Sequence, residues 1–159
     1  MKKLLLLIAF ILSFSLLSYS QSSAFSVYGG YSWVNGAIGA EYQFGSMAIS
    51  GGWFPTVMPG SNERISSFSG ALTYYGGNWD NSAYYATIGV ATAGYREQTS
   101  YNSGVWTDDV ISPMTIVMAG YKGTYKTTHC KLGFGYGWCN YGDAWTWEFT
   151  IGWTLFGNY

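Results

Sequence analysis

The sequence predicts an all-β fold, an eight-stranded antiparallel up-and-down transmembrane β-barrel. The pattern is clearest in the last segment, where every second residue is bulky and apolar: Trp145, Trp147, Phe149, Ile151, Trp153 and Leu155. The residues between them are small or polar, among them Thr146, Glu148 and Thr150. A period of two places the two sets on opposite faces of one extended strand. A strand that is apolar outside and polar inside is what a membrane-spanning barrel needs.

The overall composition also indicates lipid contact. Charged residues make up 9% of the chain and aromatic residues 20%, with 22 glycines. The surface of a soluble domain is normally about a quarter or more charged. Without the two lysines of the predicted signal peptide, Lys plus Arg falls from 7 to 5 against 8 Asp plus Glu, a net charge of −3. Nucleic-acid binding would call for a clustered basic face, so no nucleic-acid partner is expected.

Residues 1–20 are predicted to be a secretory signal peptide. Two lysines near the start precede a mainly apolar stretch, and small residues stand just before Gln21. The apolar stretch is shorter than the ~20 residues of a membrane-spanning helix. Cleavage before Gln21 is expected, with a site after Ala24 as the alternative. The mature chain, residues 21–159, is then long enough for one barrel domain.

Eight segments of the mature chain alternate with period two, each near the ~9–11 residues that a tilted barrel strand needs. They cover about 24–34, 37–44, 46–54, 64–75, 82–94, 113–121, 128–138 and 145–159. In the sixth segment both faces are apolar, with Met114, Ile116 and Met118 opposite Val117 and Ala119. Closure into a barrel is expected because an unpaired backbone N–H or C=O is costly in hydrocarbon, and only a closed sheet has no unpaired edge.

The connections predict which end of the barrel faces outward. Barrels of this kind have an even number of strands, short periplasmic turns and longer outer loops. With both termini on the periplasmic side, the outer connections are 35–36, 55–63, 95–112 and 139–144, and the inner ones are 45–46, 76–81 and 122–127. Asn35-Gly36 is a strong signal for a two-residue hairpin turn, which requires positive φ at both central positions.

Three charged residues fall on the polar faces of their strands: Glu41, Lys131 and Glu148. A basic side chain that faces lipid at the bilayer midplane would cost ~2–4 kcal/mol. Because eight strands leave room only for side chains, these charges must pair or find water. A polar plug that rigidifies the barrel is the main interpretation, and a proton or ion path is the alternative. With a loop at 139–144, Lys131 and Glu148 are expected about 13 Å apart along the strands.

The longest predicted loop, 95–112, contains a set of residues suited to recognition: Arg96, Tyr101, Trp106, Asp108 and Asp109. Aromatic residues and arginine are favoured at binding hot spots. One interpretation is therefore a recognition surface for an extracellular or envelope protein, and the other is a loop that folds over the barrel mouth. The two adjacent aspartates are weak grounds for a Ca²⁺ site.

Aromatic residues near the predicted strand ends are expected to form the girdles that lie at the membrane interfaces. They are Tyr31, Trp33, Trp53, Trp138, Trp145 and Tyr159. A ligand-binding aromatic box is the alternative, but the positions near strand ends favour a girdle and contact with membrane lipid.

The sequence predicts no catalytic, metal or cofactor site. His129 is the single histidine, and it lacks the nucleophile and orienting partner of a catalytic site. Cys130 and Cys139 are nine residues apart, which on one strand means about 30 Å at roughly 3.3 Å per residue. A disulfide needs Cα atoms within ~7 Å, so two thiols are expected.

The mature chain resembles the small OmpA/OmpX-type eight-stranded outer-membrane β-barrels, through its architecture and most specifically through Thr150-Ile151-Gly152-Trp153-Thr154-Leu155. This segment looks like the C-terminal signal read by the barrel-insertion machinery, with Gly152, Leu155 and Tyr159 as its key residues. It departs from the pattern at Gly157, where an aromatic or apolar residue would be expected. The resemblance implies the outer membrane of a Gram-negative cell envelope. Adhesion, anchoring, stress tolerance and lipid modification all occur in such barrels, so fold alone does not decide function.

Three functional hypotheses follow. The first is a non-enzymatic outer-membrane barrel that acts through its outer loops or as a structural component, with a lumen too narrow for a large pore. The second is a lipid-modifying enzyme of the same fold. The third is a soluble secreted β-barrel that binds carbohydrate through its aromatic residues.

Overall fold

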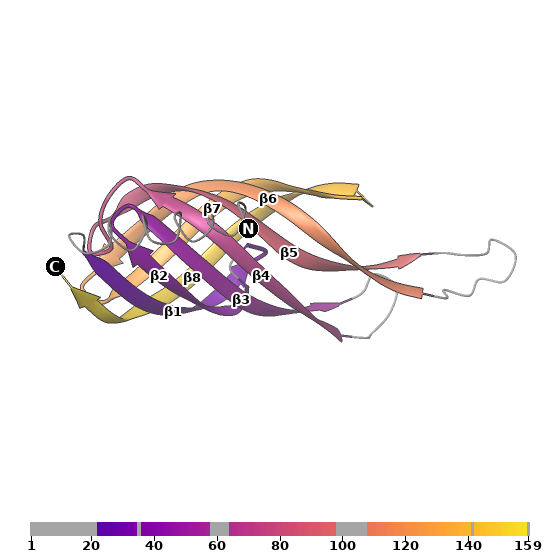
Figure 1. The fold of residues 1–159 in the computed structure, drawn as a ribbon, viewed down its shortest axis with the longest axis horizontal. Helices are drawn as coiled ribbons and strands as arrows, with labels where there is room; N and C mark the ends of the chain where they lie inside the picture. Colours follow the sequence, from indigo (N-terminus) through magenta and orange to yellow (C-terminus); the bar gives the residue numbers. More distant parts are fainter. Residues whose placement is uncertain (1–21, 35, 58–63, 98–107, 141, 159) are drawn as a thin grey trace, which may run out of the picture.

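The computed structural model describes residues 22–34, 36–57, 64–97, 108–140 and 142–158. Within these ranges lie the strands of a single sheet (Figure 1): β1 Ser23–Ser32, β2 Ile38–Phe44, β3 Met47–Val57, β4 Arg64–Tyr75, β5 Ala83–Glu97, β6 Asp108–Tyr125, β7 Thr128–Cys139 and β8 Gly142–Asn158. No helix in this part of the chain is long and apolar enough to cross a membrane. The predicted signal peptide, residues 1–20, lies outside the described residues.

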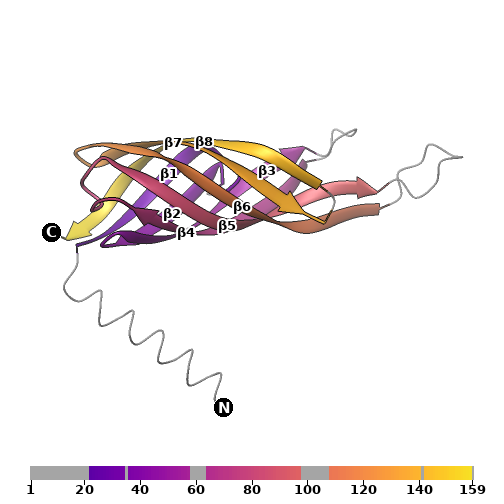
Figure 2. The same ribbon diagram turned by 90° about the horizontal axis from the view of Figure 1, so that it is seen from above.

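The sheet closes on itself. Each strand pairs antiparallel with its neighbours along the chain, and β1 also pairs with β8. The predicted all-β, eight-stranded antiparallel up-and-down barrel is therefore confirmed. Figures 1 and 2 show the start of β1 and the end of β8 together at one end of the barrel, here called the terminal end. The long β5–β6 hairpin projects from the opposite end, here called the distal end.

The alternation of the sequence determines which side chains face the interior. In β8, Thr146, Glu148 and Thr150 are buried, whereas Trp147 and Phe149 are exposed. The other strands follow the same rule, as a period of two requires. The strands that carry the predicted charges therefore turn their polar faces inward and their apolar faces outward.

The predicted loop at 95–112 is wrong at both ends, and its central part, 98–107, lies outside the described residues. β5 continues to Glu97 and β6 begins at Asp108, so Arg96 pairs with Asp109 across a two-stranded ribbon. Asp108 is paired too, opposite Glu97. Tyr101 and Trp106 lie outside the described residues.

Pro55 was expected in a loop but lies inside β3, opposite Ser66 of β4. Its missing N–H is tolerated for a geometric reason. The carbonyl of Trp53 accepts a hydrogen bond from the Ala37 N–H, so the backbone groups of Trp53 point toward β2. Pro55 is two residues further along the strand, so its backbone groups point to the same side. Pairing of β2 with β3 stops at Ile38 opposite Trp53. Pro55 therefore faces a side on which no ladder bond is required.

Two distal connections also differ from the expected ones. The β1–β2 connection is not a two-residue turn but spans 33–37, with Gly36 at φ 84°. The Gly36 N–H donates to the Ser32 carbonyl at 2.9 Å. The β7–β8 connection is shorter than the predicted loop 139–144, because Cys139 already pairs with Gly142. The β1–β2 connection is therefore longer than the turn residues suggested, and the β7–β8 connection is shorter.

The β6–β7 connection is also shorter than the predicted 122–127. β6 runs to Tyr125, and the chain reverses at Lys126, which has a positive φ of 54°. Lys122 consequently belongs to a strand and faces the interior, instead of lying in a polar turn. Cys130 and Cys139 lie at opposite ends of β7, and no disulfide joins them.

Candidate functional site in the barrel interior

The barrel interior consists of a polar layer and an apolar layer. The described residues include four charged side chains that face inward, two of each sign: Glu41, Glu148, Lys122 and Lys131. An uncompensated buried charge is expensive, whereas opposite charges in hydrogen-bonding geometry offset much of their desolvation cost. The equal numbers of carboxylates and ammonium groups make a filled, dry interior possible without a net charge.

Glu41 of β2 is the centre of the polar layer. Its Oε2 accepts from Lys131 Nζ at 2.5 Å, and the two side chains are 3% and 1% exposed. The Tyr75 hydroxyl donates to the same carboxylate, at 3.0 Å from Oε1 and 2.9 Å from Oε2. Charge-assisted hydrogen bonds of this kind are short and strong. Three strands, β2, β4 and β7, are thus joined across the lumen.

Lys122 of β6 makes a second set of contacts toward the terminal end. Its Nζ donates to Gln43 Oε1 at 3.0 Å and to the Trp79 carbonyl at 3.2 Å. The same ammonium lies 4.2 Å from the centre of the Tyr75 ring, a cation–π distance. Tyr75 therefore links the two lysines: its hydroxyl binds Glu41, the partner of Lys131, and its ring contacts Lys122.

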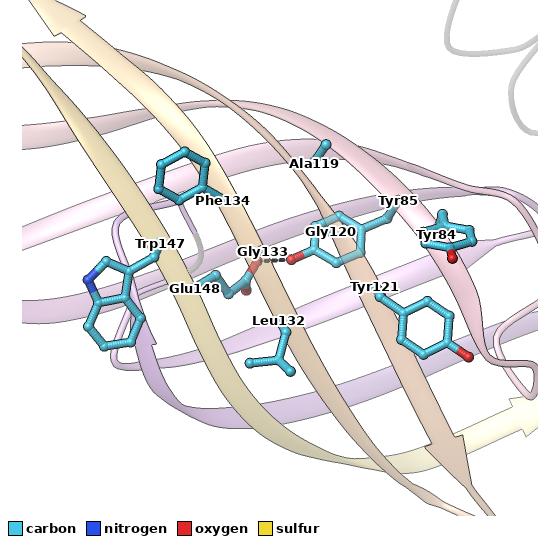
Figure 3. Close-up of a pocket in the computed structure, with 10 residues that line it drawn as sticks. All are labelled: Tyr84, Tyr85, Ala119, Gly120, Tyr121, Leu132, Gly133, Phe134, Trp147 and Glu148. Atoms are coloured by element: carbon cyan, nitrogen blue, oxygen red, sulfur yellow. Dashed lines mark hydrogen bonds between the residues drawn. The ribbon is translucent and has the colours of Figure 1, made fainter.

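Glu148 of β8 accepts a hydrogen bond from a tyrosine of β5. The Tyr85 hydroxyl donates to Glu148 Oε2 at 2.6 Å, shown as the dashed line in Figure 3. Strand register explains how the Tyr85 side chain reaches Glu148. The two residues are in one row across β5 to β8, with Gly120 and Gly133 between them. A Cβ at either glycine would collide with the Tyr85 hydroxyl group. The two glycines thus leave the space in which the tyrosine lies flat against the wall.

This register corrects the expected position of Glu148. With Cys139 paired to Gly142, Glu148 lies opposite Gly133, and Lys131 lies opposite Thr150. The offset had been derived from a longer loop, which would have brought Glu148 closer to Gly135. Lys131 instead finds its carboxylate on β2, across the lumen from its own strand.

An apolar layer fills the distal half of the interior, which the sequence pattern missed. It is a cluster of buried side chains: Val34, Phe54, Ala71, Ala91, Met114, Ile116 and Met118. Val34 comes from the β1–β2 connection, which folds into the barrel, and a Cβ at Gly89 would meet its Cγ1 at 2.8 Å. The ambiguous sixth segment is explained by this layer, since its methionines and isoleucine face inward. The lumen is therefore polar only in part.

His129 is buried near the terminal end, at 5% exposure. Its Nε2 has no hydrogen-bond partner within the described residues, and the ring lies against Gly152. In the same part of the chain, no group of three or more His, Cys, Asp or Glu side chains could hold a metal ion.

The predicted girdle residues mostly face outward near the distal end. Tyr31, Trp53, Trp138 and Trp145 are exposed, and Tyr159 lies outside the described residues. Trp33 differs, because it is half-buried against the apolar layer and donates from Nε1 to the Tyr31 hydroxyl at 2.6 Å. Exposed aromatic residues that are not among the predicted girdle residues surround the terminal end: Tyr42, Tyr74, Tyr84, Tyr125 and Trp153.

The residues of the predicted insertion signal lie on both faces of β8. Gly152 points inward beneath His129, and Leu155 is exposed. The ladder with β1 skips Leu155, because Phe25 pairs with Phe156 and Ser26 with Thr154. A β-bulge of this kind turns the last residues of the strand.

Fold and interior together define the class: a closed eight-stranded antiparallel β-barrel with a buried, charge-balanced polar layer. No family model, curated protein or solved structure matches this chain. The function must therefore be inferred from the physical properties of the barrel.

Proposed function

We propose that this chain is a small, non-enzymatic integral barrel of a Gram-negative outer membrane. In this proposal a cleaved signal peptide exports it, the barrel-insertion machinery assembles it, and its distal hairpins have a structural or recognition role. The observation that carries the proposal is the inverted sorting of side chains: large apolar residues cover the outside of the barrel, whereas ionisable residues occupy the inside.

The outer wall has the properties of a lipid-facing surface. Ile38, Phe68 and Tyr84 are 65%, 61% and 77% exposed. Tyr31 of β1 is exposed as well, and similar residues recur from β3 to β8: Ile49, Leu72, Ile88, Val117, Leu132, Phe134, Trp147 and Phe149. Monomeric soluble proteins rarely expose contiguous apolar patches beyond a few hundred Å². A wall that is apolar on all sides supports the membrane hypothesis over a soluble carbohydrate-binding barrel.

The positions of the exposed charges agree with this orientation. Among the residues whose side chains the structure describes, the exposed charged ones are Asp80, Lys126 and Asp143. Asp80 and Lys126 lie in connections at the terminal end, and Asp143 is the second residue of β8. Within that set the exposed charges lie only near the two ends of the barrel, as a band of hydrocarbon between them requires.

The β5–β6 ribbon supports a recognition role. Pairing of β4 with β5 ends at Ser69 opposite Ala91, and pairing of β6 with β7 begins at Thr115 opposite Trp138. Beyond these points β5 and β6 pair only with each other within the described residues, and Figures 1 and 2 show the ribbon projecting past the barrel. Open ribbon edges accept an added strand. This favours an extracellular or envelope protein as the partner.

The hydroxyl of Thr92 stabilises the point at which the ribbon leaves the barrel wall. It accepts from the Phe68 N–H at 2.9 Å and donates to the Phe68 carbonyl at 3.4 Å. Side-chain bonds thus replace the ladder where β4 and β5 separate. The ribbon therefore begins at a defined position.

The filled interior argues against a large pore. The apolar layer contains Ile116 and Val34 at 0% exposure, and an eight-stranded barrel has space only for side chains. We infer that the barrel does not conduct ions or solutes at an appreciable rate.

Cell fractionation tests the proposal. The mature chain should partition into the outer-membrane fraction, resist extraction with urea and migrate differently on a gel before and after heating. Replacing residues 95–110 by a short turn should leave these properties intact while abolishing partner binding. A chain that is soluble and monomeric without detergent would support the carbohydrate-binding alternative, and deacylase or acyl-transfer activity of the purified protein would support the enzyme alternative.

A further inference from the structure

A groove runs across the outer face of β5 to β8 (Figure 3). Its volume is about 650 Å³. The lining residues are Tyr84, Tyr85, Ala119, Gly120, Tyr121, Leu132, Gly133, Phe134, Trp147 and Glu148. Sites for small ligands typically measure about 300–1,000 Å³. The groove is large enough for a ligand and opens on the apolar wall.

Strand register explains the shape of the groove. One rim is the outward row Tyr84, Tyr121 and Leu132, and the other is the outward row Ala119, Phe134 and Trp147. Between them runs the inward row that contains Gly120 and Gly133. Only glycine backbone covers the Tyr85 hydroxyl there, and Ala119 leaves a gap in its rim. The groove therefore follows from two glycines and one alanine among large side chains.

Aromatic contacts fix the rims in place. Tyr84 and Tyr121 form an edge-to-face pair at 5.2 Å between ring centroids. Trp147 stacks on Tyr31 at 4.4 Å, and Phe134 stacks on Trp145 at 5.1 Å. Such pairs hold rings in defined orientations. A preformed groove loses little conformational entropy when it is filled.

We propose that this groove binds one acyl chain of a bilayer phospholipid. The inference rests on the proposed membrane location, because it takes hydrocarbon as the medium outside the wall. The groove continues the apolar outer surface and presents no charge to it. The Glu148 carboxylate lies behind the glycines and is occupied by the Tyr85 hydroxyl. An empty groove would lose dispersion contacts along both rims, whereas a flexible chain of methylenes can follow it.

The test is native mass spectrometry of the mature barrel released from membranes in a mild detergent. Ala119→Leu fills the groove from its own rim without entering the lumen. Ala40→Leu is the matched control. Ala40 also faces outward, but it lies on β2, which does not line the groove. Phe134→Ala removes part of the same rim and provides a second variant if Ala119→Leu does not fold.

The wild-type barrel and Ala40→Leu should each retain one phospholipid. Retention should fall at least five-fold in Ala119→Leu and in Phe134→Ala. A membrane-inserted barrel that emerges without lipid, or as a dimer through this face, would overturn the inference alone. Equal retention in Ala119→Leu and Ala40→Leu would do the same. Absence of the wild-type chain from the membrane fraction would overturn the proposed location first, and the lipid site with it.

Discussion

Replacing Lys131 by methionine should destabilise the barrel strongly. The change keeps a long apolar side chain but removes the ammonium group 2.5 Å from the Glu41 carboxylate. Glu41 is 3% exposed and would keep only the Tyr75 hydroxyl among its hydrogen-bond donors described above. Removing one partner of a buried ion pair costs about 3–5 kcal/mol, because the other charge stays buried and uncompensated. The loss expected for Lys131→Met lies in this range.

Urea unfolding in detergent micelles or lipid vesicles measures this loss as a change in the free energy of unfolding. Lys126→Met is the control, because Lys126 is exposed in a turn and should change stability by no more than about 0.5 kcal/mol. Adding Glu41→Gln to Lys131→Met should restore about 0.5–3 kcal/mol, since the unpaired charge is then gone. Equal losses for Lys131→Met and Lys126→Met would refute the polar layer as a stabilising element.

Three further predictions concern other parts of the barrel. Ile116→Ala should cost about 2–5 kcal/mol in the same unfolding assay, and clearly more than Val117→Ala on the neighbouring outward position. Gly133→Ala should cost about 1–3 kcal/mol through its collision with Tyr85, whereas Gly70→Ala, whose new Cβ would be 3.9 Å from the nearest atom, should cost less. A membrane-impermeant maleimide applied to intact cells should label a Cys130→Ala variant at Cys139 but not a Cys139→Ala variant at Cys130; the reverse pattern would place the terminal end outside.

Period-two alternation was sufficient to predict the closed barrel and the inward direction of Glu41, Lys131 and Glu148. These properties depend only on which residues share a face of a strand. The predicted bounds of β4, residues 64–75, agree with the structure for the same reason. Alternation says nothing about how far a strand continues beyond a polar stretch. Lys122 was therefore assigned to a turn, although it is buried beside Gln43.

The partners inside the lumen could not be predicted, because they depend on the stagger between strands and on closure of the sheet. Sequence spacing related Lys131 to Glu148, whereas the shorter β7–β8 connection and the curvature of the wall bring Lys131 to Glu41. The apolar layer was missed because Val117 and Ala119, on the opposite face of the strand, are as apolar as Met114, Ile116 and Met118. Only the position of β6 in the closed sheet shows which set faces inward.

The proposed contact of the outer wall with lipid can be tested most directly by spin labelling at single outward and inward positions, in a chain whose two native cysteines are replaced. Labels at Leu132 and Ile151, reconstituted in lipid vesicles, should be accessible to molecular oxygen and shielded from a water-soluble nickel complex. A label at the inward position Thr150 should be shielded from both. Strong quenching of the Leu132 and Ile151 labels by the nickel complex would show that water covers this surface, and would contradict a membrane-spanning barrel.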